Sequence, residues 1–487
     1  MENGVMMQYF EWNLANDGKH WERLKKDAAH LAAIGISAVW LPPVFKCSKQ
    51  EDVGYSIYDL YDLGEFDQKG TVRTKYGTKA DYLAAIAESH DHGLSVYADI
   101  VLNHKAGADA CERFQAYEVD PNNRQEKVSE AHEIEGWTRF NFPGRKGQYS
   151  HFIWTWEHFS GVDYDQLTDK KTIYMIEGLN KGWADDELVD NEYGNYDYLM
   201  YADIDYRHPD VIREIKKWAD WFLKTTGVDG FRLDAVKHIN REFIVQLADH
   251  IRKTYRNSFY LVGEFWKDET QAVVDYLEGT AFKLDLFDVT LHMNFYQAAQ
   301  QGRDYDLRKI LDGTLMKEHS SLAVTFVDNH DTQPGQSLES YVAPWFKLQA
   351  YSLILLRAEG FPDVFYGDYY GLKGPKPSEG YQEELDTLIT LRRKFAFGDQ
   401  KDYFQDKNCI GWTRSGSASH PGGLVVILST GDENKLSMNV GPESKGKTYA
   451  DRIGRRQDQV KIDEEGEWNF SGQWRFILRL DLHLNGE

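Results

Sequence analysis

The chain has 487 residues, with 56 lysines and arginines against 78 aspartates and glutamates, for a formal net charge of −22. This length exceeds what one modest core needs, so we expect one large domain with one or two smaller ones. An acidic surface repels nucleic acid and anionic membranes, so we expect neither as a partner.

The three cysteines, Cys47, Cys111 and Cys409, are too few and too widely spaced for a disulfide framework or a zinc pattern. No apolar run reaches the length of a membrane span. The first residues, MENGVMMQYFEW, lack the basic and then apolar pattern of a signal peptide. We therefore expect a cytoplasmic protein; secretion with a leader removed from this chain is the alternative.

Short β-rich segments alternate along the chain with longer amphipathic segments. The predicted strands lie within 7–10, 36–43, 94–104, 228–238, 259–266, 283–290, 322–331 and 362–371. The predicted helices lie within 20–35, 78–93, 209–227, 241–255, 268–280, a less regular stretch from Leu291, 345–360 and 381–398. Eight such units predict a (β/α)8 barrel, with its active site at the carboxyl ends of the strands. A doubly wound open sheet is the alternative, but no glycine-rich phosphate turn follows the first strand.

Two regions depart from this alternation. Residues 104–207 are rich in Trp, Tyr, Asp, Gly and Asn, and a segment of that length needs a structure of its own. After about Gly398, short strands follow one another, as in NCIGWTRSG, GGLVVILST, KLSMNV and QWRFILRL. We predict a barrel formed by 1–103 and 208–396, an inserted irregular β-rich domain at 104–207, and a C-terminal antiparallel β-sandwich at 397–487.

The stretch GFRLDAVKH places an arginine and an aspartate two positions apart on an apolar strand. Residues i and i+2 of a strand point to one face, so Arg232 and Asp234 share a space, where burial is costly unless they serve each other or a ligand. Glu264 and Asp331 also stand at or near the carboxyl ends of predicted strands. In a barrel these ends converge, so three carboxyl groups are expected to meet at one mouth.

Several carboxyl groups without a cysteine or a serine–histidine pair suit glycoside hydrolysis, which needs one protonated acid and one ionised carboxylate. The guanidinium of Arg232 is expected to keep Asp234 ionised as a nucleophile. Glu264 has apolar neighbours in VGEFW and is expected to keep a raised pKa as the acid.

The segments ADIVLNH, GFRLDAVKH, VGEFW and FVDNHD resemble the four conserved regions of the α-amylases of glycoside hydrolase family 13. YDYLMYADIDY, VFYGDYYG and MQYFEW are similar to the liquefying bacterial group of that family. The resemblance runs from Met7 over nearly the whole chain. It implies endo-acting, retaining hydrolysis of α-1,4-glucosidic bonds in starch, glycogen or maltodextrins.

By match to these motifs, the resemblance implies that Asp234 is the nucleophile, Glu264 the acid/base and Asp331 the transition-state stabiliser. It implies seven substrate-binding residues: Tyr55, His104, Arg232, Lys237, His238, Trp266 and His330. It further implies one Ca²⁺ bound by Asn103, Asp197, Asp203 and the backbone carbonyl of His238, all oxygen ligands of the kind that calcium prefers.

Many enzymes of the liquefying group also carry a second calcium and a sodium nearby. Asp186 and Asp205 match that pattern, but Ser160 and Arg207 stand where aspartates are expected. Each change removes a negative ligand, and a guanidinium can neutralise carboxylates as a cation would. We therefore expect one Ca²⁺, with Arg207 in place of the further metal.

Two other functions stay open at this point. One is a transglycosylase, or a sucrose- or trehalose-acting relative, on the same fold. The other is a non-catalytic glucan-binding or scaffold protein, which the presence of all three carboxyl groups disfavours. We expect an α-1,4-glucan as substrate and a monomeric protein.

Overall fold

A computed structural model describes residues 3–430, 434–440, 445–446, 448–453, 459–462, 467–472 and 478–481. Its centre is a closed barrel of eight parallel strands that follow one another in chain order. These strands are β1 (Met6–Gln8), β2 (Ala38–Leu41), β5 (Ser95–Ile100), β13 (Gly230–Leu233), β14 (Tyr260–Gly263), β15 (Asp285–Phe287), β16 (Ala323–Phe326) and β17 (Phe361–Phe365). The (β/α)8 prediction is confirmed, and the open-sheet alternative is wrong because β1 pairs with both β2 and β17.

Helices surround the barrel. They are α1 (His20–Ile34), α2 (Lys79–Asp91), α3 (Pro209–Thr226), α4 (Arg241–Thr254), α5 (Thr270–Gly279), α6 (Val289–Gln301), α8 (Pro344–Leu356) and α10 (Gln382–Phe395), with short α7 (Leu315–Glu318) and α9 (Tyr366–Tyr370). In α3, Ile215, Trp218 and Phe222 recur at helical spacing on the buried face. The helix ends at Gly227, whose φ of +71° is left-handed and suits glycine. Sequence periodicity and an end signal thus place α3 against the barrel.

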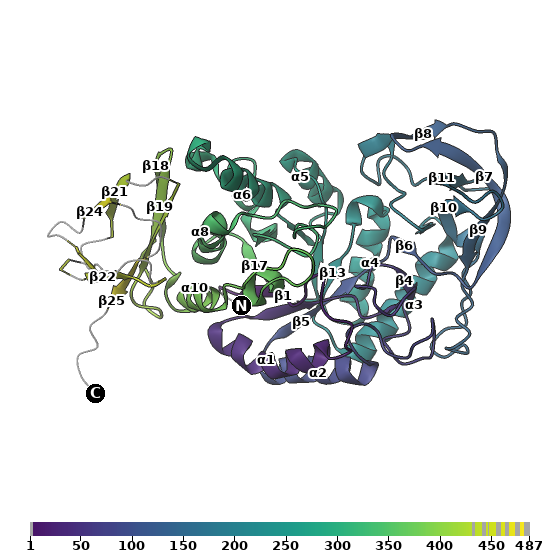
Figure 1. Cartoon of the computed structure of the whole chain (residues 1–487), viewed down its shortest axis with the longest axis horizontal. Coiled ribbons are helices and arrows are strands. Elements are labelled where there is room, and N and C mark those ends of the chain that lie inside the picture. Colours follow the sequence, from purple (N-terminus) through teal and green to yellow (C-terminus); the bar gives the residue numbers. More distant parts are fainter. Residues whose placement is uncertain are drawn as a thin grey trace.

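Between β5 and α3, the insertion forms a sheet of its own, far from the C-terminal strands (Figure 1). Its strands are β6 (His104–Lys105), β7 (Ala110–Asp120), β8 (Asn123–Lys127), β9 (His132–Arg139), β10 (Phe159–Asp165), β11 (Lys170–Ile176) and β12 (Ala202–Ile204). The first and last of them pair with each other, with Asp203 opposite His104. The insertion therefore leaves and rejoins the barrel at one place, beside the carboxyl ends of the barrel strands. A small hairpin of β3 (Lys46–Cys47) and β4 (Ile57–Asp59) lies in the loop after β2.

The C-terminal part is antiparallel, as predicted. One sheet contains β18 (Gln400–Asp406), β19 (Cys409–Arg414), β20 (Leu424–Ser429), β22 (Thr448–Asp451), β23 (Gln459–Lys461) and β25 (Leu478–Asp481), and a second pairs β21 (Asn434–Asn439) with β24 (Glu467–Gly472). Leu436 and Met438 of the second sheet join Val425 and Ile427 of the first in one buried cluster. Residues 473–477 of the predicted strand QWRFILRL lie outside the described residues. The exact domain limits stay a prediction.

Candidate active site

One buried guanidinium organises the carboxyl ends of β5, β13 and β14. Nη1 of Arg232 donates to Oδ1 of Asp234 at 2.7 Å and to Oδ1 of Asp99 at 2.9 Å. Nη2 of the same residue lies 2.9 Å from Oε2 of Glu264. Arg232 is only 1% exposed, so these ion pairs form away from bulk water. The register explains the contact, because Arg232 stands opposite Asp99 on one side and Val262, two residues before Glu264, on the other.

The backbone after Asp234 is arranged around Glu264. Ala235 adopts left-handed backbone angles, with φ of 50° and ψ of 40°. Its N–H donates to Oε2 of Glu264 at 3.1 Å, while the N–H of Glu264 donates to the carbonyl of Leu233. A non-glycine residue in this conformation carries strain of the kind that accumulates at functional sites. The strained turn therefore fixes the position of Glu264 relative to Asp234.

Burial governs the protonation of this carboxyl cluster. Burial raises the pKa of Asp234, and Arg232 opposes the rise through its charge and its hydrogen bond. The guanidinium therefore limits the rise, whereas the sequence alone suggested that it would simply keep Asp234 ionised. Burial also raises the pKa of Glu264, against the charge of Arg232, and the repulsion of Asp234 adds to the rise. Asp331 has a pKa well above its usual range, owing to burial and the repulsion of Glu264.

Three flat rings lie beside these carboxyl groups. The ring of Tyr55 stacks on that of His330 with centroids 5.2 Å apart and planes 11° apart. Trp12 lies nearly parallel to both, at 6.1 Å from Tyr55 and 6.0 Å from His330. Nε2 of His330 is 3.3 Å from Oδ2 of Asp331, so the stack reaches the third carboxyl group. Stacked aromatic faces of this kind suit the apolar face of a sugar ring.

An open pocket of about 380 Å³ joins these groups. Eight predicted site residues line it: Tyr55, His104, Asp234, Lys237, His238, Glu264, Trp266 and Asp331. Arg232 and His330, both 1% exposed, are not in the lining and support it through their contacts with Asp234 and Tyr55. The fold thus gathers every predicted catalytic and substrate-binding residue in or beside one pocket.

The insertion forms part of the pocket wall. Nζ of Lys237 donates to Oε2 of Glu192 at 3.0 Å and to the carbonyl of Trp266 at 3.1 Å. Nδ1 of His238 lies 2.7 Å from the carbonyl oxygen of Tyr196. At the start of the insertion, Nε2 of His104 lies 2.8 Å from the carbonyl oxygen of Tyr55, which belongs to the loop after β2. These contacts connect the barrel end to the insertion.

Asp99 and Trp12 are among the site residues that sequence reasoning missed. Asp99 is buried in β5, and its Oδ2 accepts hydrogen bonds from Nε1 of Trp40 and the hydroxyl of Tyr55, both at 3.0 Å. The signal was present, since an aspartate inside the apolar run SVYADI needs a partner as much as Arg232 does. Trp12 lies in the loop after β1, where no periodicity marks it.

Three of the predicted calcium ligands, the side chains of Asn103, Asp197 and Asp203, lie together at the junction of insertion and barrel. Nδ2 of Asn103 donates to Oδ1 of Asp203 at 3.0 Å, and Oδ1 of Asn103 is buried without a hydrogen-bond partner. The hydroxyl of Ser160 donates to Oδ2 of Asp203. Burial raises the pKa of Asp203 well above its usual range, and the repulsion of Asp197 adds to this. Buried, mutually repelling carboxylates with an orphaned amide oxygen fit a hard divalent cation.

The neighbouring acidic residues are already satisfied. Oδ1 of Asp205 accepts from Nε of Arg207, and its Oδ2 accepts from Nζ of Lys181, both at 3.0 Å. Asp186 accepts hydrogen bonds from the side-chain amides of Gln125 at 2.6 Å and Asn195 at 2.8 Å. Arg207 therefore neutralises Asp205, and Lys181 adds a second cation that the sequence did not reveal. The replacement of a metal by Arg207 stays a prediction.

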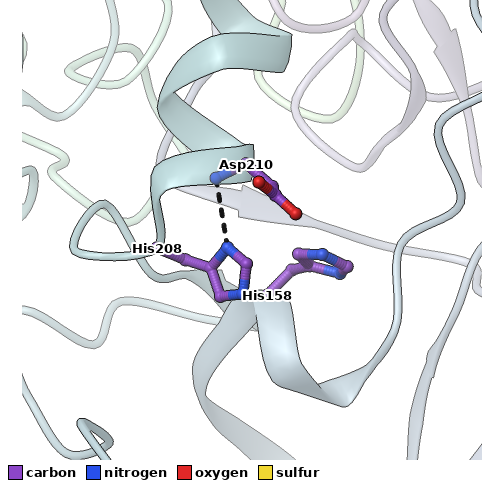
Figure 2. A group of neighbouring side chains, drawn as sticks. All are labelled: His158, His208 and Asp210. Atoms are coloured by element: carbon purple, nitrogen blue, oxygen red, sulfur yellow. Dashed lines mark hydrogen bonds between the residues drawn. The ribbon is translucent and has the colours of Figure 1, made fainter.

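A further group of potential ligands, His158, His208 and Asp210, lies at the start of α3 (Figure 2). Nδ1 of His158 accepts from the backbone N–H of Thr155 at 2.9 Å, and Nδ1 of His208 accepts from that of Asp210 at 3.2 Å. A neutral imidazole that accepts at Nδ1 carries its proton on Nε2, which leaves no lone pair for a metal. These histidines therefore satisfy backbone N–H groups, and we do not assign them a metal.

Among the described residues, no helix has both the length and the apolar character needed to cross a membrane.

The solved α-amylase of Geobacillus thermoleovorans, complexed with acarbose, superposes with a TM-score of 0.64 at 19% identity, covering 99% of this chain and 98% of that one. This likeness concerns the fold.

Sequence relatives are much more similar. A glucan 1,4-α-maltohexaosidase of Bacillus sp. (strain 707) is 50% identical over 474 residues, which cover 96% of this chain and 90% of the relative. An α-amylase of Bacillus licheniformis is 49% identical over 487 residues, covering 99% and 92%. A cytoplasmic α-amylase of Escherichia coli (strain K12) is 44% identical over 482 residues, covering 96% and 97%. The family model of the α-amylase catalytic domain matches residues 23–449, and the chain therefore belongs to the α-amylase family.

Proposed function

We propose that this protein hydrolyses internal α-1,4-glucosidic bonds of starch, glycogen or maltodextrins with retention of configuration. The observation that carries the proposal is the single guanidinium of Arg232 that contacts both Asp234 and Glu264 at the mouth of the pocket. The two carboxyl groups lie 2.7 and 2.9 Å from the two terminal nitrogens of this one guanidinium. This proximity favours the spacing of about 5–5.5 Å of retaining enzymes over the roughly 6.5–9.5 Å of inverting ones.

The environments of the carboxyl groups support a division of roles. Asp234, hydrogen-bonded to a fixed positive charge, attacks the anomeric carbon and forms a covalent glycosyl-enzyme. Glu264 protonates the departing glycosidic oxygen and then removes a proton from the attacking water. Asp331 stabilises the positive charge that develops on the sugar ring in both steps.

The remaining pocket residues suit the binding of a glucan chain. We assign the stacked ring of Tyr55 to the sugar at the cleavage point, held also by His104, Arg232 and His330. Lys237, His238 and Trp266, on the side of the insertion, would contact the leaving-group sugars. The pocket is open, so a polymer can pass through it without presenting an end.

The test is the configuration and the size of the first products. NMR in the first minutes of maltooligosaccharide hydrolysis should show the α-anomer, and iodine staining of starch should fall while few reducing ends appear. Glu264→Gln is the matched control, since it keeps the shape of the side chain and removes the acid. A β-anomer would overturn the retaining mechanism, and a slow loss of iodine colour with many reducing ends would overturn internal cleavage.

We further propose one resident Ca²⁺, held by Asn103, Asp197, Asp203 and the carbonyl of His238. The orphaned amide oxygen of Asn103 and the repulsion between the two buried aspartates support this set. The ion would join the insertion to the barrel and neutralise these aspartates. Asp186 and Asp205 have other partners, which supports a single site.

Metal analysis after dialysis should give about one calcium per chain. Asp203→Asn should lose it, whereas Asp186→Asn should retain it, and EDTA should lower the melting temperature of the wild type. Two or three calcium ions per chain, or a melting temperature that EDTA leaves unchanged, would contradict the assignment.

We also propose that the protein is a cytoplasmic monomer. The name of the Escherichia coli relative supports the location, and the net charge of −22 disfavours nucleic acid and anionic membranes as partners. Light scattering coupled to gel filtration, and fractionation of the producing cell, test the two statements. A dimer mass, or activity confined to the medium, would contradict them.

A further inference from the structure

A second large cavity, of about 740 Å³, opens at the end of the barrel opposite the active site. Its wall includes Ser37, directly before β2, and the first residues of three strands, Ser95 of β5, Asp285 of β15 and Phe361 of β17. The amino ends of the barrel strands therefore form this cavity, whereas the carboxyl ends form the catalytic pocket. On its other side lie Arg392 of α10 and Arg414, the last residue of β19 in the C-terminal sheet.

Arg414 is buried here with an unused donor. The residue is 6% exposed, and its Nε and Nη2 groups donate to the carbonyl of Gly398 at 3.3 and 3.1 Å. Its Nη1 group is buried without a hydrogen-bond partner among the described residues. An unsatisfied donor of a buried charged group costs free energy. Arg414 lines the cavity, so an anion bound there would compensate the charge of a guanidinium that the protein leaves partly unsatisfied.

Arg392 lines the same cavity. It is 3% exposed, its Nε donates to the carbonyl of Gly4 at 3.2 Å, and its Nη1 donates to that of Leu355 at 2.7 Å. Its Nη2 makes no hydrogen bond with the described residues. Both residues line the same cavity, and burial and the positive charge of Arg414 lower the pKa of Arg392 to about 9.

The carboxylates near this pair are engaged elsewhere. Glu359 accepts hydrogen bonds from Arg357 at 3.1 Å and from Gln400 at 3.0 Å, and Asp402 accepts two from Arg357, at 2.8 and 2.9 Å. Glu359 still acts on Arg414 through space, but three arginines face two carboxylates in this group. Asp285 has its pKa raised by burial to about 6, so it is still mostly ionised at neutral pH, and it faces the cavity from the opposite wall. One positive charge at the C-terminal side of the cavity is therefore not compensated.

We propose that this cavity binds a phosphate group, as inorganic phosphate or as a sugar phosphate, between the guanidiniums of Arg392 and Arg414. A tetrahedral dianion offers oxygen atoms to both residues at once, and arginine binds phosphate with directed, charge-assisted hydrogen bonds. The volume exceeds what a bare ion needs, and the polar wall, which includes Ser95, Ser320 and Ser321, suits the rest of a phosphorylated sugar.

Isothermal titration calorimetry of the full-length protein tests this at fixed ionic strength and fixed free calcium, with inorganic phosphate and glucose 6-phosphate titrated separately. The wild type should bind one phosphate group per chain. Arg392→Gln and Arg414→Gln should each weaken binding about tenfold or more, the usual effect of losing a hydrogen bond to a charged group. Arg393→Gln is the matched control, since it removes an exposed arginine of the same helix and should leave the affinity unchanged.

Tighter binding of glucose 6-phosphate would identify a sugar phosphate, and equal affinities would identify the phosphate group alone. Lysine at position 392 or 414 keeps the positive charge but loses the paired nitrogen donors of the guanidinium, so the affinity for phosphate should be intermediate. These lysine variants replace a glutamine variant that does not fold. Starch hydrolysis without phosphate should stay at the wild-type rate in all variants. The proposal would be overturned if the wild type showed no saturable binding, or if the wild type and both glutamine variants bound phosphate with equal affinity. It would also be overturned if titration of sodium chloride gave the same binding signal as titration of phosphate.

Discussion

Replacement of Arg232 by lysine should move the acid limb of the pH–activity profile upward. Nη1 of Arg232 hydrogen-bonds to Asp234 at 2.7 Å, and this contact opposes the rise in the pKa of Asp234 that burial causes. A hydrogen bond to a charged group contributes about 1.5–3 kcal/mol, or about 1–2 pKa units at 1.36 kcal/mol each. Asp234 must be ionised to attack, so activity would be lost at a pH about 1–2 units higher than in the wild type.

Stability should fall as well, because the ammonium group of lysine cannot reach three carboxyl groups at once. Breaking a buried ion pair costs about 3–5 kcal/mol. Arg357→Lys is the matched control: Arg357 is equally buried and binds Asp402 and Glu359 at the opposite end of the barrel. That variant should lose comparable stability and keep the wild-type pH profile.

The assay is kcat/KM for a chromogenic maltooligosaccharide between pH 4 and 9, together with thermal unfolding of both variants. Because kcat/KM reports the ionisation of the free enzyme, the pH at which activity falls on the acid side reports the pKa values of the carboxyl cluster without bound substrate. An unchanged acid limb in Arg232→Lys, with stability reduced as in Arg357→Lys, would refute the electrostatic role of Arg232 and leave only a structural one.

Four further predictions concern the pocket and its surroundings. Asp234→Asn should fold and lose several orders of magnitude in rate, and retention of more than about a tenth of the activity would exclude Asp234 as the nucleophile. Glu264→Gln should lose less activity on substrates whose leaving group needs no proton than on substrates whose leaving group must be protonated, and equal losses would contradict its role as the acid. Trp12→Ala should raise KM for maltooligosaccharides through the loss of stacking, and an unchanged KM would remove Trp12 from the binding surface. Arg207→Gln should lower the melting temperature more than Arg213→Gln, because Arg213 is 71% exposed at its side chain and Arg207 binds Asp205 and two carbonyls.

The barrel and the principal site could be predicted because their signals are local. Each βα unit carries its own periodicity, and parallel strands in chain order bring their carboxyl ends together whatever the connections contain. The apolar run around Asp99 indicates that this residue needs a partner, but it does not say which one. The partner, Arg232, belongs to a strand beyond the insertion, and their pairing depends on a register that no local pattern specifies. Lys181 escaped prediction for the same reason: it meets Asp205 only once the insertion folds back on itself.

The contacts of Arg232 have a consequence for how the site obtains its acid. Asp99, Asp234 and Glu264 surround one guanidinium, and Asp331 is repelled by all three. Four carboxyl groups beside one fixed positive charge cannot all be ionised at moderate cost, so the set retains protons collectively and its ionisation constants belong to the group. Lys237, the lysine that already lines the pocket, is paired with Glu192 and only partly opposes this effect. A further lysine in contact with the carboxyl groups should lower their pKa values together and reduce the fraction of Glu264 that carries the catalytic proton.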